Sequence, residues 1–206
     1  MGQRVQENFI QQNNKVSVCF TTLDSSGESE IQHLAGINKL KVSENREILA
    51  TAGRDGNVRT FSTNDTEQKL SFRKIVSRHN SWVNDLQIIQ NTDNRIVSVG
   101  NDCCVYLHDN NLYQHNDYIK CITSLPTSPQ IIYTAGLDCC IKSYDTKQQP
   151  VTAAQILNTN ESIYAIQGFG NLLAYGTTGS VLEVVDVREW KSKVFGQKLN
   201  NNRHWF

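Results

Sequence analysis

The stretch His79–Asp102, HNSWVNDLQIIQNTDNRIVSVGND, decides the fold that this sequence predicts. A first run of interspersed apolar and polar residues follows Trp82, and a second β-rich run, Arg95–Val99, is followed by Gly100, Asn101 and Asp102. Alternation between clusters of Asn, Asp and Gly favours short antiparallel strands over a helix, whose apolar residues would recur every three or four positions. The stretch therefore predicts a β-hairpin followed by a tight turn.

The same arrangement recurs along the chain as an internal repeat. His33-Leu-Ala-Gly-Ile37 leads to Asp55, and His115-Asn-Asp-Tyr-Ile119 leads to Asp138. A weaker fourth copy runs from Glu161-Ser-Ile163 to Gly179, which stands at the Asp position. The steps between successive turn positions are 47, 36 and 41 residues. A period of about forty residues predicts a repeated supersecondary unit.

Each copy carries further strands at matching places. The strands before the turn are expected at Ile48–Ala52, Arg95–Val99, Ile131–Ala135 and Leu172–Gly176. The strands after it are expected at Val58–Phe61, Val105–His108, Ile141–Tyr144 and Val181–Val185. Four short strands in about forty residues are typical of one blade of a β-propeller. We therefore expect an all-β chain of about four blades.

Residues at fixed places in the copies resemble those of WD40 repeats. That family places a His before the first strand, a Ser or Thr in the second, an Asp in the next turn and a Trp in the third. The resemblance implies buried hydrogen-bonding roles for His33, Thr51, Asp55, His79, Ser98, Asp102, His115, Thr134 and Asp138. The Trp position holds Phe61, His108, Tyr144 and Val185. Because Phe61 cannot donate a hydrogen bond, we expect its network partners to bind water.

Six strings in order resemble the WD40 proteins that serve as cofactors of ubiquitin-specific proteases. They are Lys15-Val-Ser-Val-Cys-Phe, Ala52-Gly-Arg-Asp55, Trp82-Val-Asn-Asp85, His115-Asn-Asp-Tyr-Ile-Lys120, Ala135-Gly-Leu-Asp138 and Ser162-Ile-Tyr164. The resemblance spans residues 15–199. It implies a non-catalytic scaffold, without a cofactor, that binds and helps activate such a protease. It also implies a location in the nucleus and cytoplasm, with the late endosome surface as a further compatible site.

The length of 206 residues supplies only part of the ring that the resemblance implies. We expect a flexible segment 1–14, a strand 15–22 belonging to the ring-closing last blade, and a tail 200–206. The repeats are expected at about 33–78, 79–114, 115–157 and 158–199, as an open ring. Only five residues separate Asp109 from His115, fewer than the roughly ten that a strand with two turns needs. The outer strand of the second blade is therefore expected to be missing or vestigial, whereas Trp190–Leu199 would supply that of the fourth.

Propellers bind partners mostly through loops on one face. The residues at the start of each first strand and just before each turn Asp should lie on that face. This reasoning gives the partner-binding candidates Arg54, Trp82, Asn84, Asn101, Tyr118, Lys120, Leu137 and Tyr164. Large aromatic side chains beside Arg and Lys are typical of interaction hot spots. The alternative interpretation is packing between blades.

The cysteines and histidines invite a metal or catalytic interpretation, which the repeat explains more simply. Cys103-Cys104 and Cys139-Cys140 are separated by one repeat step, and adjacent residues of an extended chain point to opposite sides. Cys19 and Cys121 are expected in the core, and the thiols are expected to be reduced. No nucleophile elbow, phosphate-binding loop or zinc-protease motif is present in the sequence. We therefore expect neither a metal site nor an enzyme.

Composition narrows the function further. Lys and Arg number 20, as do Asp and Glu, so the net charge of zero does not favour a general nucleic-acid binder. No apolar run is long enough for a membrane-spanning helix, and we expect no membrane insertion. Three hypotheses remain beside the protease cofactor: a generic protein adaptor, a thiol- or metal-dependent enzyme, and a family fragment without independent activity. Self-association through open blade edges is compatible with the cofactor and the adaptor.

Overall fold

The computed structural model describes residues 11–12, 15–16, 32–64, 69–89, 94–108, 110–148, 153–190 and 193–198. The chain divides into two compact units, Met1–Gln32 and His33–Phe206. In the first unit, β1 (Gln11–Gln12) pairs antiparallel with β2 (Lys15–Val16). The other residues of 1–14, of 15–22 and of the tail 200–206 lie outside the described residues, so what the sequence predicts for them stays a prediction.

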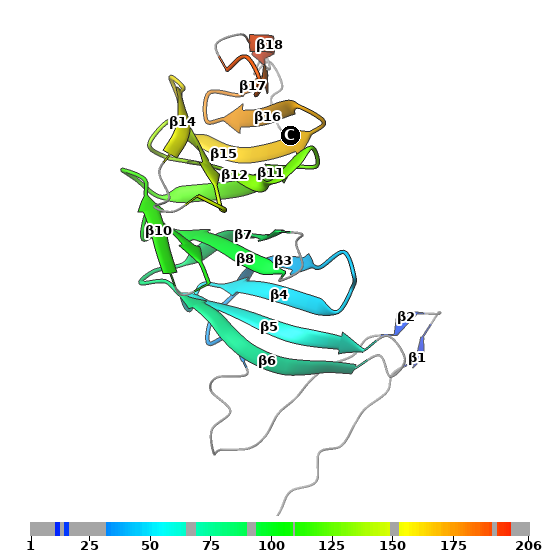
Figure 1. Cartoon of the computed structure of the whole chain (residues 1–206). Helices are drawn as coiled ribbons and strands as arrows, with labels where there is room; N and C mark the ends of the chain where they lie inside the picture. Colours follow the sequence, from blue (N-terminus) through cyan, green and yellow to red (C-terminus); the bar gives the residue numbers. More distant parts are fainter. Residues whose placement is uncertain are drawn as a thin grey trace, which may run out of the picture. The chain divides into compact units, whose positions relative to one another are not determined.

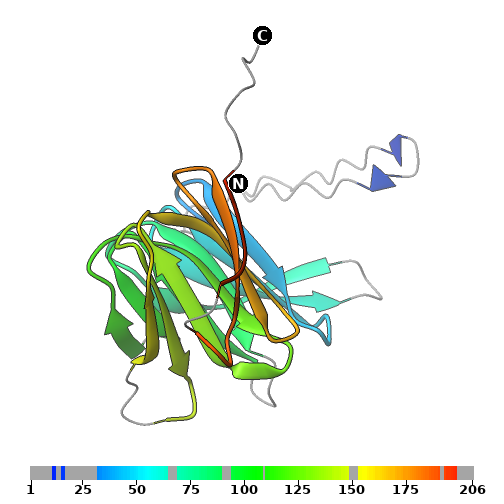
Figure 2. The ribbon, with the colours of Figure 1, turned by 90° about the horizontal axis from the view of Figure 1, so that it is seen from above.

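The second unit contains four antiparallel sheets of four consecutive strands each (Figure 1). The first two sheets are β3 (Ile37–Val42), β4 (Ile48–Gly53), β5 (Asn57–Asn64) and β6 (Lys69–Arg78), then β7 (Val83–Ile89), β8 (Arg95–Gly100), β9 (Cys104–Leu107) and β10 (Asn110–Gln114). The other two are β11 (Ile119–Leu125), β12 (Ser128–Gly136), β13 (Cys140–Asp145) and β14 (Ala153–Asn158), then β15 (Ile163–Phe169), β16 (Leu172–Thr177), β17 (Val181–Asp186) and β18 (Lys193–Lys198). The prediction of an all-β, blade-like fold in an open arrangement is confirmed. Figure 2 shows the ribbon from above.

A left-handed residue closes the turn between the second and third strands of every sheet. Gly56, Cys103, Cys139 and Ser180 have φ of 80°, 63°, 57° and 61°. Each directly follows the Asp position, where the chain must reverse within a few residues. The two Cys pairs therefore start in turns rather than on an extended chain, which corrects the geometry assumed for them. Their spacing follows from the repeat.

The second sheet has a complete outer strand, so the prediction that this strand is missing or vestigial was wrong. Asn110 of β10 pairs with Leu107 of β9, and the pairing continues to Gln114 with one bulge. Only residues 108 and 109 separate the two strands, and His108 has a left-handed φ of 52°. A tight hairpin connection of this kind needs no extra residues. The estimate of ten residues counted separate turns that the chain does not use.

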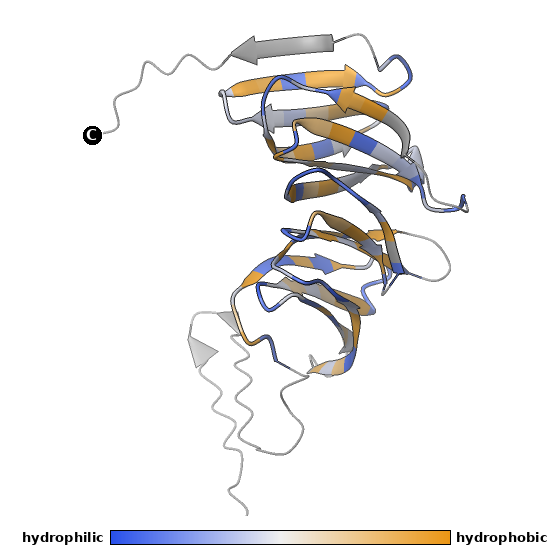
Figure 3. Cartoon of the chain, turned by 90° about the vertical axis from the view of Figure 1, so that its left-hand side faces the viewer, coloured by the Kyte–Doolittle hydropathy of each residue, from blue (hydrophilic) through white to orange (hydrophobic). Residues whose placement is uncertain are grey.

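The hydrophobic cores lie between successive sheets. One cluster joins Val58 and Ala52 of the first sheet to Leu86 of the second. A second joins Val105 to Ile122 of the third sheet, and its other members also come from these two sheets. The third joins residues of the third and fourth sheets, among them Leu125, Ile141, Ile163 and Leu173. Apolar residues concentrate on the strands and hydrophilic ones in the turns (Figure 3). Each sheet therefore completes its core only against its neighbours.

A buried hydrogen-bond network ties the loop before each of the first three sheets to the turn after its second strand. The imidazole Nδ1 donates to the Asp carboxylate over 2.8–3.0 Å, and Nε2 accepts from the hydroxyl over 2.7–2.8 Å. We assign this tautomer from the carboxylate that faces Nδ1. The networks are His33–Asp55–Thr51, His79–Asp102–Ser98 and His115–Asp138–Thr134.

Arg59 completes the network of the first sheet. Its side chain is 1% exposed, and its Nη1 lies 2.7 Å from Asp55 Oδ2. The hydroxyl of Thr51 is bonded to His33. The sequence analysis expected the network partners of Phe61 to bind water and gave Arg59 no role. The WD40 pattern described above assigns none to the fourth residue after the turn Asp. In the structure that position supplies a buried guanidinium.

We expect the network to make stability depend on acid pH. Burial opposes ionisation of Asp102, but the hydrogen bond and electrostatic attraction of His79 and the N–H groups of Cys104 and Asn80 outweigh it. They hold the pKa of the Asp102 carboxyl below its usual 3.8. Its stabilising contribution is therefore complete above pH 3.8 and is lost as the pH falls through the lowered pKa of the folded state. Asp102→Asn should cost about 1–3 kcal/mol at pH 7, and this difference should shrink toward pH 2. Urea unfolding of the wild type and of Asp102→Asn across this pH range measures the difference in free energy of unfolding. An equal difference at both ends of the range would contradict the stabilising role of the Asp102 carboxylate.

Arg59→Met should lower the free energy of unfolding by about 3–5 kcal/mol, because it leaves a buried carboxylate without its cationic partner. The matched control is Arg188→Met, which removes an exposed guanidinium paired with Asp186 and should change the unfolding midpoint little. Thermal and urea unfolding followed by circular dichroism compares the two. Equal losses would mean that burial of the pair does not decide its contribution.

Candidate protein-interaction surface

The partner-binding candidates come from two places that strand pairing brings together. Ile37 pairs with Gly53, Val83 with Gly100 and Ile119 with Gly136, so the start of each inner strand lies beside the end of the second strand. The residues around the start of the inner strand are Trp82, Asn84, Tyr118, Lys120 and Tyr164, and those just after the second strand are Arg54, Asn101 and Leu137. The antiparallel pairing places both groups at the same end of their sheets.

Arg54 of the first sheet reaches the second sheet at this end. Its guanidinium carbon lies 4.9 Å from the centre of the Trp82 ring, and its Nε donates to Asn38 Oδ1 over 2.9 Å. Asn38 in turn donates to the carbonyl oxygen of Val83 over 2.8 Å. The hydrogen bonds fix the guanidinium beside the indole while about half of the Trp82 surface stays exposed. This geometry is a cation–π contact with accessible aromatic area.

A second group joins the second and third sheets. Asn84 Nδ2 donates to Asn101 Oδ1 over 2.8 Å and to the carbonyl oxygen of Ile119 over 2.6 Å. Lys120 Nζ donates to the same Asn101 oxygen over 3.0 Å and lies 5.3 Å from the centre of the Tyr118 ring. Asn84 and Asn101 thus position Lys120 and at the same time hold the sheets together. We call Arg54, Trp82, Tyr118 and Lys120 the cation–aromatic surface.

Leu137 follows β12 of the third sheet, where its N–H donates to the carbonyl oxygen of Tyr118 over 2.9 Å, and Tyr164 lies on the fourth sheet. Leu137 is half-buried, and its carbonyl oxygen accepts a hydrogen bond from Ser162 Oγ over 3.1 Å. Tyr164, on β15, is exposed. The binding role of all eight candidates stays a prediction.

Sequence reasoning missed the polar links from sheet to sheet below this surface. Lys39 Nζ lies 3.1 Å from Asp85 Oδ1, and the other oxygen of Asp85 accepts from the backbone N–H of Ile122 over 3.2 Å. One carboxylate therefore connects the first three sheets. Asn38 and Asn84 occupy matching positions in their repeats, which is the signal that could have revealed such links.

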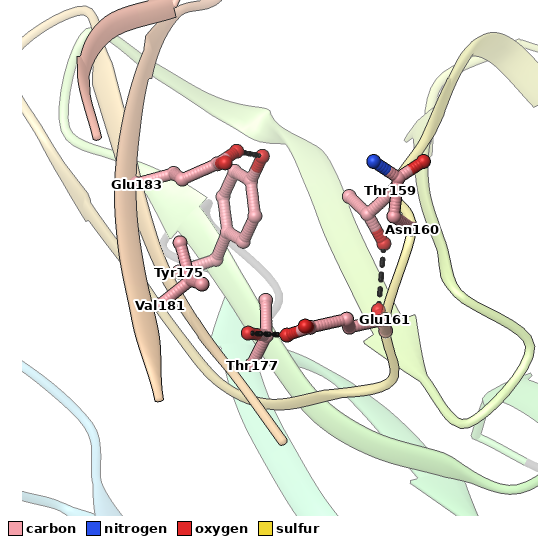
Figure 4. Close-up of a pocket in the computed structure, with 7 residues that line it drawn as sticks. All are labelled: Thr159, Asn160, Glu161, Tyr175, Thr177, Val181 and Glu183. Atoms are coloured by element: carbon pink, nitrogen blue, oxygen red, sulfur yellow. Dashed lines mark hydrogen bonds between the residues drawn. The ribbon is translucent and has the colours of Figure 1, made fainter. Parts of the chain in front are cut away.

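The fourth sheet replaces the histidine network with a pocket of about 90 Å³ (Figure 4). Its lining consists of Thr159, Asn160, Glu161, Tyr175, Thr177, Val181 and Glu183. The backbone N–H of Thr159 donates to the carbonyl oxygen of Cys139. The backbone N–H of His115 makes the same bond to the carbonyl oxygen of Cys103 one repeat earlier, so Thr159 stands at the His position. Its side chain is smaller than that of His and is part of the lining of the pocket.

Glu161 takes over the part of the lost turn Asp. One of its carboxylate oxygens accepts from Gly179 N over 2.8 Å and from Thr177 Oγ1 over 2.5 Å. Across the pocket the Tyr175 hydroxyl donates to Glu183, and burial together with this carboxylate raises the pKa of Tyr175 above its usual value. The sequence showed that His and Asp were absent here, but the replacement comes from a loop residue two positions after the His position.

Three further features concern the described residues. Within these ranges, no group of three or more His, Cys, Asp or Glu side chains is arranged to hold a metal ion. Burial raises the pKa of the Cys121 thiol. Cys19 lies outside the described residues. The same part of the chain contains no helix long and apolar enough to span a bilayer.

The hydrogen bonds predict different effects for two neighbouring candidates. Asn84→Ala should lower the free energy of unfolding by about 1–2 kcal/mol, because it removes a link between sheets. Tyr118→Ala, at an exposed position, should change it by less than about 0.5 kcal/mol. Urea unfolding of the two variants measures the difference. A larger loss for Tyr118→Ala would mean that this ring is structural.

Comparison with protein families matches the chain to the model described as WD domain, G-beta repeat. The match covers residues 17–62, 70–109 and 110–145, which is more than half of the chain. WD40 domains are generally non-catalytic scaffolds that bind protein partners. The repeated His, Ser or Thr and Asp residues, the four-stranded sheets and this match agree, and the chain belongs to the WD40-repeat family.

Proposed function

We propose that this WD40 scaffold binds a ubiquitin-specific protease and helps to activate it. The observation that carries the proposal is the ordered set of six strings between Lys15 and Tyr164, which resemble the N-terminal half of WD repeat-containing protein 48, a WD40 cofactor of ubiquitin-specific proteases. Three of these strings contribute to the cation–aromatic surface: the first of the three holds Arg54, the next holds Trp82 and the last holds Tyr118 and Lys120.

The chemistry of the cation–aromatic surface supports protein binding. Two exposed aromatic rings are each accompanied by a cation, and hydrogen bonds to Asn38 and Asn101 hold the two cations in place. Pre-positioned side chains lose little conformational entropy on binding, which favours affinity. Tryptophan and arginine are the residue types most often found at hot spots.

Activation would be a shift of population rather than a chemical contribution. A scaffold that binds the productive conformation of a protease better than the unproductive one raises the fraction of active enzyme. No residue of the scaffold needs to enter the protease active site. We propose the nucleus and the cytoplasm as the location.

The test is capture of ubiquitin-specific proteases on the immobilised chain, followed by a ubiquitin-cleavage assay with and without it. We expect binding and a higher cleavage rate. Trp82→Ala or Arg54→Ala should weaken the complex by about 2 kcal/mol, roughly thirtyfold in Kd. Lys147→Ala, an exposed position outside the cation–aromatic surface, is the control and should bind normally. Absence of both binding and rate change would contradict the proposal, and unaltered affinity of the two variants would remove them from the site.

A further inference from the structure

The first sheet exposes residues that the other sheets bury. Ile37, Leu40 and Val42 of β3 are 52%, 56% and 54% exposed. The residues at the same register positions of β7 are Val83, Leu86 and Ile88, at 0%, 0% and 5%. The counterparts of Ile37 and Leu40 in β11 and β15 are also buried, with exposed fractions of 9% or less: Ile119, Ile122, Ile163 and Ile166. In the second, third and fourth sheets the preceding sheet covers these positions.

The fourth sheet exposes the opposite set. Leu182 of β17 is 41% exposed, whereas Val58, Val105 and Ile141, its counterparts in the first three sheets, are fully buried. Phe169 at the end of β15 is 46% exposed, whereas Ile89 and Leu125 at the ends of β7 and β11 are 0% and 1% exposed. In the earlier sheets the following sheet covers these positions. We call Ile37, Leu40 and Val42 the leading face, and Phe169 and Leu182 the trailing face.

We propose that the trailing face of one copy docks on the leading face of a second copy, and that two such contacts close a ring of eight blades. The new contact would continue an interface that the chain already forms three times between its own sheets. Val58, the counterpart of Leu182 on the trailing face, and Leu86, the counterpart of Leu40 on the leading face, belong to one buried cluster. A second copy can therefore continue the same packing without any new kind of contact.

Any closed ring of copies would cover every face, so closure at two copies follows from the blade count. Each copy has one leading and one trailing face, on sheets that two others separate (Figure 1). A dimer with a two-fold axis covers all four faces in two equivalent contacts and leaves none to recruit further copies. Two copies of four sheets give a ring within the roughly four to eight blades that propellers usually adopt, and a third copy would exceed that range. This inference does not depend on which partner the cation–aromatic surface binds.

The first experiment measures the mass of the purified full chain by light scattering and sedimentation across a range of concentrations. We expect twice the chain mass at the upper concentrations and dissociation on dilution. A monomer at every concentration would overturn the proposal. A mass that keeps growing with concentration would also overturn it, because the faces would then form an open chain rather than a ring.

The second experiment uses two variants that each disable one face, Leu40→Asp and Leu182→Asp. A homodimer of either variant has both contacts disabled, so each variant alone should be monomeric. An equimolar mixture has one contact between two intact faces and should form a mixed dimer. Mixtures that stay monomeric, or single variants that stay dimeric, would overturn the proposal.

Leu40 and Leu182 are exposed in the single copy, so we expect both variants to fold. Their circular dichroism spectra and melting temperatures should match those of the wild type diluted until it is monomeric. If Leu40→Asp or Leu182→Asp does not fold, the milder pair Val42→Ser and Phe169→Ser replaces it in the same test. The control Lys147→Asp changes an exposed residue outside both faces and should dimerise as the wild type does. Loss of its dimer would overturn the assignment of the contacts to these faces.

Discussion

The structure depends on the apolar contact between one sheet and the next. A single four-stranded sheet of this chain has too little depth to bury its own side chains, so each core cluster draws its residues from two successive sheets. The hydrophobic effect rewards the area removed from water, and here that area is gained only by stacking. The three inter-sheet cores therefore hold together the four sheets and the loop surface above them.

Polar groups set the geometry that apolar contact leaves undefined. The histidine networks fix the loop before each of the first three sheets to the turn beyond its second strand. Asn38, Asn84 and Asp85 fix one sheet against the next. Such groups are costly to bury unless they are bonded, so a fully bonded set favours one arrangement. The cation–aromatic surface depends on these supports, because Asn38 and Asn101 position its two cations.

The repeats diverge where the networks lie, and the divergence is compensated locally. The fourth residue after the turn Asp or its counterpart is Arg59, Tyr106, Lys142 or Glu183 in successive sheets. Arg59 supplies a buried charge, Tyr106 packs its ring edge-on to His79, and Lys142 lies 3.8 Å from Asp138. In the fourth sheet Glu161 replaces the missing carboxylate, and a pocket remains where the ring is absent. The same backbone pattern therefore accommodates four different sets of side-chain contacts at this position.

The sequence by itself determined the strands, the turns and the repeat, because alternation and turn residues act over a few positions, and it placed Arg54, Trp82, Tyr118 and Lys120 at one end of their sheets. It failed at β10, because counting residues could not foresee a left-handed His108 that makes a two-residue connection feasible. Tertiary structure decided that Arg59 completes a network, that Glu161 stands in for an Asp, and that Asn84 links sheets. Those roles require residues from different strands or sheets to meet. Leu40 and Leu86 stand at matching positions of their repeats, yet Leu40 is exposed and Leu86 is buried, because a preceding sheet covers only Leu86.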